Sequence, residues 1–430
     1  MLSIVIDTCI VFYKNVDYTL LMIQRPYYID ALKKSIGSPL IKVITGIRRS
    51  GKSSLLVLLE ENLITSGIEL SRILKVNMES LEFDHLREYG AMYRYVKERL
   101  PKGGFFLLDE AQEVSGWERL VSSFLAEGKI ECFVTGSNAS LLRSELGTLL
   151  TGRYIEFPVL PLTFNEYLVF QAERSNSLYG KESSQQNQQS LLVSYMRFGG
   201  FPAIQFLDDD NSIVAYLSTL LDSILLRDVV KKHTIRDTEA LRRILAFAFD
   251  NVGNITSSRR ISEYFKSQRR TVSIDTVANY LGYLCDAFAL HKVPRFDIKG
   301  KQRLEFSEKY YAGDLGLRNA LLGYRSSDIS GLIENIVFLE LLHRGYKVSV
   351  GIIGSLEVDF IAEKSGQKVY FQICVSMDDP LTMEREFGSL ERIDDHWPKT
   401  IITYMPVPLS GRSGIQVVTL NDFLMEPTQL

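Results

Sequence analysis

The chain has 430 residues, more than one hydrophobic core usually supports, so we expect two or three domains. Hydrophobic residues make up 46% of it and charged residues 23%, values that exclude wholesale disorder and a fibrous architecture. The net charge of −3 is unevenly spread, since residues 231–310 hold 16 Lys and Arg against 9 Asp and Glu. This middle segment could therefore face an anionic partner.

The first residues, MLSIVIDTCIVFY, are apolar, but they include Asp7, lack a basic start and fall short of the roughly 20 residues of a membrane span. We expect neither a signal peptide nor a membrane anchor. Met22 is an alternative start, which would make residues 1–21 a separate N-terminal extension. The four cysteines lie far apart without a C-x-x-C pair, which favours a reducing compartment. Together these features predict a cytoplasmic protein.

Short apolar strands alternate with helical stretches over residues 40–160, as in a parallel α/β sheet. The predicted strands cover residues 40–47, 73–78, 105–110 and 130–137, and a helix is predicted at 52–67. The Gln- and Ser-rich run at 173–190 predicts a surface loop that closes this first domain. Helical patterns then follow to about residue 290, with a break at Gly200-Phe201-Pro202. The last hundred residues return to mixed helices and strands.

A glycine-rich loop separates the first predicted strand from the first predicted helix. Its residues, Gly46-Ile47-Arg48-Arg49-Ser50-Gly51-Lys52-Ser53, fit G-x-x-x-x-G-K-[ST] at every fixed position, and Ser54 extends the segment into the helix. In such a loop, successive N–H groups surround a polyphosphate and the lysine reaches the β- and γ-phosphates. The serine hydroxyl binds Mg²⁺. The motif therefore predicts ATP and Mg²⁺ as ligands.

An acidic pair, Asp109 and Glu110, ends the apolar strand FFLLDE. We expect Asp109 to hold the Mg²⁺ ion together with Ser53, and Glu110 to orient or activate the attacking water. A chance match in a surface loop is one alternative, which the agreement of strand, loop and acidic strand end disfavours. The other alternative is a site that binds ATP but has lost hydrolysis.

Two further polar positions are candidates for the same site. Ser137 and Asn138 follow the next predicted strand, where Asn138 could sense the γ-phosphate; an ordinary turn is the alternative. Arg153, in TGRY, is a candidate arginine finger, in cis or from a neighbouring subunit of a homo-oligomer. An ordinary surface arginine held in a salt bridge is the alternative.

These motifs continue into LLDEAQEVSGWERL, FVTGSNASLL, LTGRYIEFPVLPLTFNEYL and FGGFPAI. With them, nearly all of residues 22–410 resemble a large prokaryotic family of AAA-like ATPases, whose D-E-x-Q…W signature matches Asp109-Glu110, Gln112 and Trp117. The resemblance implies an α/β fold with an AAA+-like core of strand order 5-1-4-3-2, a small helical lid, a winged-helix-like segment and a restriction-endonuclease-like C-terminal domain. We accordingly predict an ATPase core at 22–172, a linker and lid at 173–230, a winged-helix-like segment at 231–325 and a nuclease-like domain at 326–430.

The middle segment over residues 259–303 has the order helix, turn, helix and strand pair, which is that of a winged helix-turn-helix. Basic side chains gather near its turn and its wing: Arg259, Arg260, Lys266, Arg269, Arg270, Lys299, Lys301 and Arg303. Salt-sensitive contacts to phosphates would follow if this face meets DNA. The alternative is a rigid connector between domains.

The last domain carries an incomplete set of nuclease residues. Glu334, Asp359 and Gln372 resemble the constellation of PD-(D/E)xK nucleases, in which carboxylates hold a divalent metal and a lysine helps to place the water. Here Gln372 replaces the second acid and Cys374 the lysine, although Glu357 adds a carboxylate on the strand face of Asp359. We therefore predict a degenerate site without nuclease activity.

Three classes of function follow. The first is an ATPase whose nucleotide cycle drives a conformational switch acting on nucleic acid or on a protein partner. The second is an ATP-gated nuclease, which Cys374 disfavours. The third is a regulatory protein that senses nucleotide and turns it over slowly.

Overall fold

The computed structural model describes residues 23–139, 152–179, 188–408 and 411–426. The chain divides into two units: residues 1–159 with 169–183, and residues 160–168 with 184–430. Each unit is built around its own β-sheet. The predicted extension over residues 1–21 lies outside the described residues.

The sheet of the first unit has five parallel strands in the order β2-β3-β4-β1-β5. Its strands are β1 (Ile41–Thr45), β2 (Ile73–Asn77), β3 (Gly104–Asp109), β4 (Ile130–Gly136) and β5 (Tyr154–Pro158). This order confirms the α/β fold class and the strand order implied by the family resemblance. Apolar runs alone had not predicted β5, because it is an edge strand whose side chains are mostly exposed.

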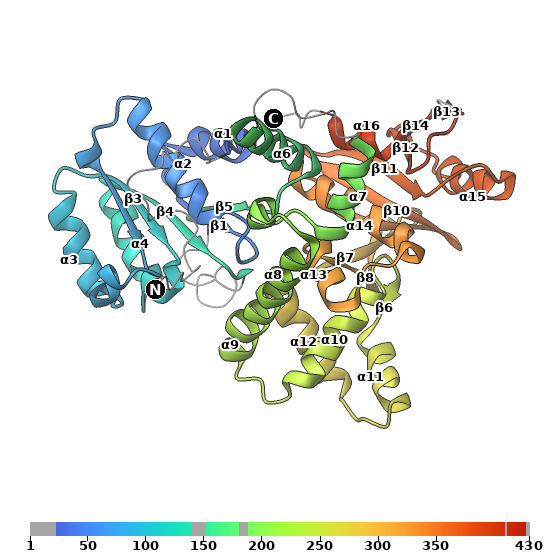
Figure 1. Ribbon diagram of the computed structural model, residues 1–430, viewed down its shortest axis with the longest axis horizontal. Coiled ribbons are helices and arrows are strands. Elements are labelled where there is room, and N and C mark those ends of the chain that lie inside the picture. The colour runs from blue at the N-terminus through green and yellow to red at the C-terminus, as the bar shows by residue number, and fades with distance from the viewer. Residues whose placement is uncertain (1–22, 140–151, 180–187, 409–410, 427–430) are drawn as a thin grey trace. The chain divides into compact units, whose positions relative to one another are not determined.

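Helices cover both faces of this sheet, which is why its inner strands are apolar on both sides (Figure 1). Val43, Phe106 and Val134 pack with one group of helices, and their neighbours Ile44 and Phe133 with the other. The first group contains α3 (Tyr89–Arg99) and α4 (Trp117–Glu127); the second contains α1 (Pro26–Ser35) and α2 (Lys52–Thr65). Short 3₁₀ turns complete the unit: η2 (Leu70–Arg72), η3 (Leu81–Leu86) and η4 (Ala111–Glu113).

The polar run at residues 173–190 is not the loop that its composition predicts. Helix α6 (Phe164–Tyr179) extends well into the run, and α7 (Gln188–Phe198) begins before it ends; residues 180–187 lie outside the described residues. The prediction was wrong for the helical parts because Glu and Gln are good helix formers, and polarity alone does not break a helix. Helix α7 then ends just before the predicted break at Gly200-Phe201-Pro202.

The second unit continues with a series of helices before and between its strands (Figure 1). These are η7 (Pro202–Phe206), α8 (Asp210–Ser223), the π-helical η8 (Ile224–Val230), α9 (Lys231–His233), α10 (Thr238–Asp250), α11 (Ser258–Ser267), α12 (Ile274–Asp286), α13 (Leu315–Leu322), η9 (Ser326–Asp328), α14 (Ile329–His343), α15 (Pro380–Glu391) and α16 (Leu420–Met425). None of the described helices is long and apolar enough to span a membrane.

Its sheet has nine strands in the order β13-β14-β12-β11-β10-β9-β7-β8-β6. They are β6 (Ile255–Thr256), β7 (Leu290–Asp297), β8 (Gln302–Ala312), β9 (Lys347–Ile353), β10 (Leu356–Lys364), β11 (Gln367–Cys374), β12 (Lys399–Thr403), β13 (Gly411–Arg412) and β14 (Ile415–Thr419). The hairpin β7–β8 joins this sheet because β7 pairs in parallel with β9. The predicted boundary between residues 325 and 326 thus falls inside one continuous sheet, and the division of this unit stays a prediction.

Candidate functional site

The glycine-rich loop connects the carboxyl end of β1 to the first residue of α2, as predicted. Gly46 has φ 148° and Gly51 has φ 99°, backbone conformations that residues with a Cβ atom rarely adopt. A Cβ atom on Gly46 would lie 2.1 Å from the carbonyl oxygen of Val159, so no larger residue fits there. The loop therefore presents its backbone N–H groups at the positive end of α2.

Side chains of the loop are arranged as an anion site requires. The ammonium group of Lys52 folds over the loop and donates to the carbonyl oxygens of Gly46 (2.9 Å) and Ile47 (3.0 Å). The hydroxyl of Ser50 is buried and has no hydrogen-bond partner within the described structure. A phosphate oxygen would supply the missing acceptor, because buried hydroxyl groups are normally hydrogen-bonded.

The acidic pair lies at the end of β3, the strand next to β4. Thr135, on β4, donates from Oγ1 to Asp109 Oδ1 (2.5 Å) and accepts from the backbone N–H of Glu110 (2.9 Å). Glu110 has φ 55°, and its carboxylate accepts from the side chain of Gln112. The structure thus fixes both carboxylates, with Thr135 as a support that the motif had not indicated.

Ser53 and Asp109, the two predicted metal ligands, come together in the structure. Burial, followed by the neighbouring charge of Glu110, raises the pKa of Asp109, whereas hydrogen bonds from Thr135 and Ser53 lower it. A cation at this position would favour the charged carboxylate. The hydroxyl of Ser53 and the carboxylate of Asp109 are oxygen ligands of the kind that Mg²⁺ prefers, so these residues fit the ion.

Of the remaining predicted residues, Ser54 and Asn138 lie at the same edge of the sheet as the glycine-rich loop, and Arg153 does not. Ser54 lies in the first turn of α2, and the buried Asn138 follows β4, between β3 and β1. Arg153 instead precedes β5, and its carbonyl accepts from the N–H of Ile41, the first residue of β1. It therefore lies at the amino edge of the sheet, about 16 Å of strand from the loop, and does not reach the phosphate loop of its own chain.

Two residues near the loop were not predicted from the sequence. Arg25, just before α1, is buried and donates from Nη1 to the carbonyl oxygen of Ser50 (3.1 Å). Glu79 follows β2 and pairs with Arg48, with 3.6 Å between Oε1 and Nη1. Neither residue belongs to a motif, and each lies at least 25 residues from the loop residue that it contacts, so only the fold brings them together.

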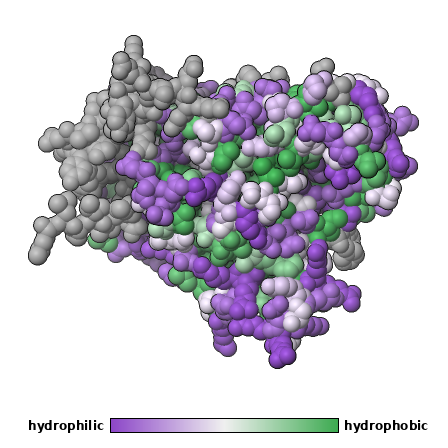
Figure 2. Space-filling model, turned by 45° about the vertical axis from the view of Figure 1, so that its right-hand side comes forward, coloured by the Kyte–Doolittle hydropathy of each residue, from purple (hydrophilic) through white to green (hydrophobic). Residues whose placement is uncertain are grey.

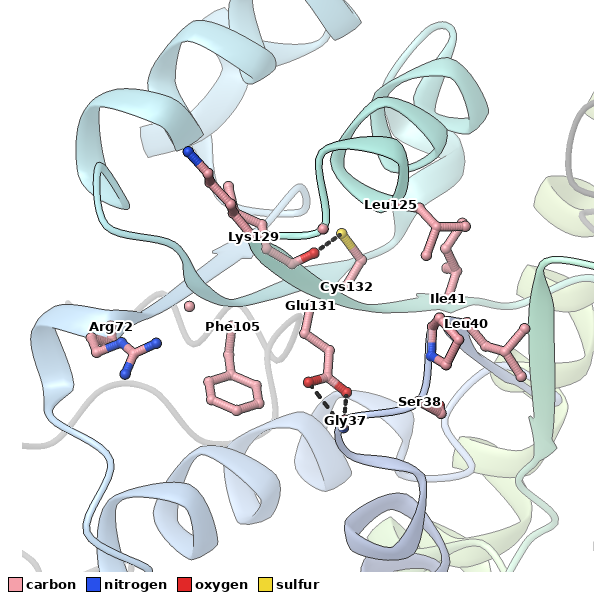
Figure 3. A pocket seen from close by; sticks show the side chains of 14 residues that line it. Gly37, Ser38, Leu40, Ile41, Arg72, Phe105, Leu125, Lys129, Glu131 and Cys132 are labelled. Atoms are coloured by element: carbon pink, nitrogen blue, oxygen red, sulfur yellow. Dashed lines mark hydrogen bonds between the residues drawn. The ribbon is translucent and has the colours of Figure 1, made fainter.

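A separate cavity of about 310 Å³ opens at the amino edge of the same sheet (Figure 3). Glu131 lines it, accepts from the backbone N–H of Gly37 (3.0 Å) and forms an ion pair with the fully buried Lys42. No predicted site residue lines this cavity. The cavity lies at the opposite edge of the sheet from the glycine-rich loop and is not the nucleotide site.

The predicted nuclease residues do converge in the second unit, but around an unexpected cation. Lys309, on β8, places Nζ 2.9 Å from Glu334 Oε1 and 2.7 Å from Glu357 Oε1. The hydroxyl of Tyr311 donates to the same oxygen of Glu334 (2.6 Å). Asp359 accepts from the backbone N–H of Ile373 (2.8 Å). The expectation that this site lacks a positive charge was therefore wrong: the charge comes from β8, outside the predicted domain, and not from position 374.

Burial and charge set the protonation of this cluster. Burial acts to lower the pKa of Lys309, but the carboxylates of Glu334, Asp359 and Glu357 outweigh it, and the pKa is raised. Burial, followed by the charge of Glu334, raises the pKa of Asp359 well above its usual range. Burial also raises the pKa of Cys374 to about 12, so its thiol stays neutral. Among the described residues, no group of three or more His, Cys, Asp and Glu could hold a metal ion.

The basic residues of the middle segment are placed on α11, on the turn after it and on the β7–β8 hairpin. Hydrophilic surface covers the lower tip of the view in Figure 2, where Figure 1 places α11. Helix α12, the second helix of the predicted pair, contains two Asp and neither Lys nor Arg. Arg259 pairs with Glu263 (3.2 Å), and Arg260 donates to the carbonyl of Ile255 (3.0 Å). The positive charge therefore lies beside α12 and not on it.

Comparisons with known proteins agree with the geometry of the first unit. Residues 38–168 match a family model described as an AAA domain, and residues 189–328 match one described as a domain of unknown function. An uncharacterized protein of Haemophilus influenzae is 35% identical over 410 residues, covering 94% of this chain and 99% of the relative. An uncharacterized protein of Methanocaldococcus jannaschii is 29% identical over 398 residues, covering 89% of this chain and 85% of that protein.

Among solved structures, a Walker-type ATPase of Pyrococcus abyssi is similar at a TM-score of 0.50 and 13% identity. The match covers 70% of this chain and 95% of that structure. At this identity the likeness concerns the fold alone.

Proposed function

Because the chain belongs to the family of the uncharacterized Haemophilus influenzae protein and carries an AAA-type P-loop ATPase domain, we propose that it binds ATP with Mg²⁺ and hydrolyses it to ADP and phosphate. The observation that carries this proposal is the meeting of Lys52, Ser53, Asp109 and Glu110 at one edge of the sheet. The unpartnered hydroxyl of Ser50 in the same loop supports an anionic ligand.

Each residue has a role in this proposal. The backbone from Gly46 to Ser54 surrounds the phosphates, and Lys52 exchanges its loop carbonyls for the β- and γ-phosphate oxygens. Ser53 and Asp109 would hold Mg²⁺, which supplies charge neutralisation at the phosphates. Glu110 accepts a hydrogen bond from the attacking water and orients it, while Asn138 contacts the terminal phosphate. Thr135 keeps Asp109 and Glu110 in place.

The nucleotide cycle would drive a conformational switch that acts on nucleic acid or on a protein partner. The basic side chains of residues 259–303 support DNA as the partner, whereas the lack of Lys and Arg on α12 argues against reading of bases by that helix. Helices α10 to α12 and the strands β6 to β8 follow the order of a winged helix, so we keep this segment at 231–325 as part of the proposal. In this proposal, the C-terminal domain at 326–430 recognises a partner without cleaving it.

The test is phosphate release by the full chain, measured alone and with single-stranded DNA, duplex DNA or RNA. Stimulation of ATP hydrolysis by one of these nucleic acids would support the conformational switch and identify the class of partner. A slow rate that none of them changes would favour the nucleotide-sensing regulatory protein. Calorimetry with ATP and Mg²⁺ measures nucleotide binding, on which the proposal depends. An absence of binding would contradict the proposal.

A further inference from the structure

The phosphate site contains an arginine that the loop itself supplies. Arg48 is the third residue of the loop and Arg49 the fourth, and Arg49 adopts φ 67°, a left-handed conformation that is unfavourable for a residue with a Cβ atom. These are the arginines that the loop brings to the site, whereas Arg153 lies at the opposite edge of the sheet. The loop therefore supplies candidate arginines to neutralise the negative charge that builds up on the γ-phosphate during its transfer.

Arg48 forms an ion pair with Glu79, a residue outside the loop. The distance between Arg48 Nη1 and Glu79 Oε1 is 3.6 Å, longer than a direct hydrogen bond. Their side chains are 13% and 32% exposed. A pair at this distance is loosely held, so an anion that accepts two hydrogen bonds from the guanidinium would displace Glu79.

The position of Glu79 brings this pair to the edge of the sheet where Asp109 and Glu110 lie. Glu79 lies two residues beyond Asn77, the end of β2, which is in register with Asp109 on β3. Its backbone N–H donates to Asn77 Oδ1 (2.9 Å), which fixes the turn. Burial, followed by the charge of Glu110, raises the pKa of Glu79, whereas the charges of Arg49 and Arg48 act to lower it. Glu79 thus lies within electrostatic reach of both the arginines of the loop and the two carboxylates that would hold the ion and the water.

We propose that Arg48 is a cis arginine for the γ-phosphate and that Glu79 is its partner when that phosphate is absent. ATP, which brings a terminal phosphate, takes Arg48 from Glu79; ADP leaves the pair in place. Glu79 therefore lowers the affinity for ATP without changing that for ADP, and it sets the discrimination between them. This inference rests on the proposed ATPase function, since it concerns the same nucleotide site.

The test is a double-mutant cycle with Arg48→Gln, Glu79→Gln and both together, using the full chain and calorimetry. The probes are Mg²⁺ with ADP and with a non-hydrolysable ATP analogue that has an imido group between the β- and γ-phosphates. Arg48→Gln should weaken binding of the analogue about tenfold or more, and binding of ADP by less than about twofold. Glu79→Gln should strengthen binding of the analogue, and this gain should vanish in the Arg48→Gln background.

Glu82→Gln is the matched control, because it removes an exposed carboxylate three residues further along the same segment. It should leave both affinities unchanged. If Glu79→Gln strengthens binding equally with and without Arg48, Glu79 acts by charge repulsion alone and the inference fails. Equal losses of ADP and analogue in Arg48→Gln would also overturn it. Both results leave the ATPase proposal standing, whereas a parent protein that binds neither nucleotide removes the ATPase proposal itself.

Discussion

Lys309 Nζ and Glu334 Oε1 lie 2.9 Å apart in the interior of the second unit, with Lys309 only 2% exposed. The two residues come from β8 and α14, and Glu357 on β10 completes the contact at 2.7 Å. Buried charges are tolerated only when they are paired, so this lysine and its carboxylates depend on one another. The pairing links the hairpin to the C-terminal strands more specifically than apolar packing does.

The first prediction is that Lys309→Met destabilises the second unit by about 3–5 kcal/mol, because it leaves buried carboxylates without a counter-charge. The free energy of unfolding from urea titration measures this. Lys292→Met is the control, since Lys292 forms a pair with Glu308 (2.5 Å) on the same hairpin but is 52% exposed. Its loss should cost no more than about 1 kcal/mol. Equal effects of the two substitutions would contradict the role of Lys309.

The sequence predicted the first sheet well because its strands are short apolar runs and its loop is a contiguous motif. Val43 and Ile44, adjacent in β1, face opposite helical layers, so both successive positions are apolar. The edge strand β5 lacks this signal because it has an exposed face. The polar part of α6 could not be predicted from composition, because Glu and Gln are common both in loops and in helices.

The arrangement of the candidate site could be predicted where its residues are consecutive, but not where the fold brings distant residues together. Gly46 to Ser54 and Asp109-Glu110 stand in recognisable order, and the structure brings both to one edge. Arg25, Glu79 and Lys309 contact their partners across 25 or more residues, and no local pattern marks such residues. The nuclease pattern has its lysine two positions after the residue that Gln372 replaces, on the same strand face, where this chain has Cys374; the structure instead supplies a buried lysine from β8.

The second prediction is that Lys52→Ala abolishes tight binding of ATP, because this ammonium group is the main side-chain charge on the β- and γ-phosphates. Calorimetry with ATP and Mg²⁺ measures the affinity. Lys129→Ala is the control, since Lys129 is exposed beside the cavity at the opposite edge of the sheet. Unchanged affinity in Lys52→Ala would contradict the assignment of the loop.

The third prediction is that Glu110→Gln still binds ATP but does not turn it over, because the amide keeps the shape of the side chain and removes the carboxylate that orients the water. Phosphate release at saturating ATP measures turnover. Glu113→Gln is the matched control, as Glu113 is an exposed carboxylate three residues further on that pairs with Arg87 (2.9 Å). Turnover at the parent rate in Glu110→Gln would leave Glu110 without a catalytic role.

The fourth prediction concerns Arg153, which lies too far from the loop of its own chain to act in cis. If it completes the site of a neighbouring subunit, Arg153→Ala should lower turnover about 10³-fold while nucleotide affinity stays nearly unchanged. The rate per subunit of the parent protein should also rise with protein concentration. A parent rate in the variant, independent of concentration, would make Arg153 a structural residue.

The last prediction is that the C-terminal domain does not cleave DNA, and the structure changes the reason for it. The positive charge is present, but Lys309 is already held by Glu334 and Glu357, and the neutral thiol of Cys374 adds none. The loss of one preorganised stabilising group costs about 10² to 10³ in rate, and Gln372 lacks a carboxylate as well. Linear, supercoiled and single-stranded DNA should therefore stay intact with Mg²⁺ or Mn²⁺, with and without ATP.

Plasmid nicking and gel analysis of labelled strands measure this, with Asp359→Ala as the control for contaminating nucleases. Cleavage that disappears in Asp359→Ala would overturn the prediction and make the ATP-gated nuclease the leading function. The converse experiment combines Gln372→Glu with Cys374→Lys, which restores the carboxylate and adds a cation that Glu334 and Glu357 do not already hold. Metal-dependent nicking gained by this double variant would mean that the backbone still holds the geometry of a nuclease. In that case the parent is inactive because of two side chains, and the pairing of Lys309 is compatible with a metal ion beside it.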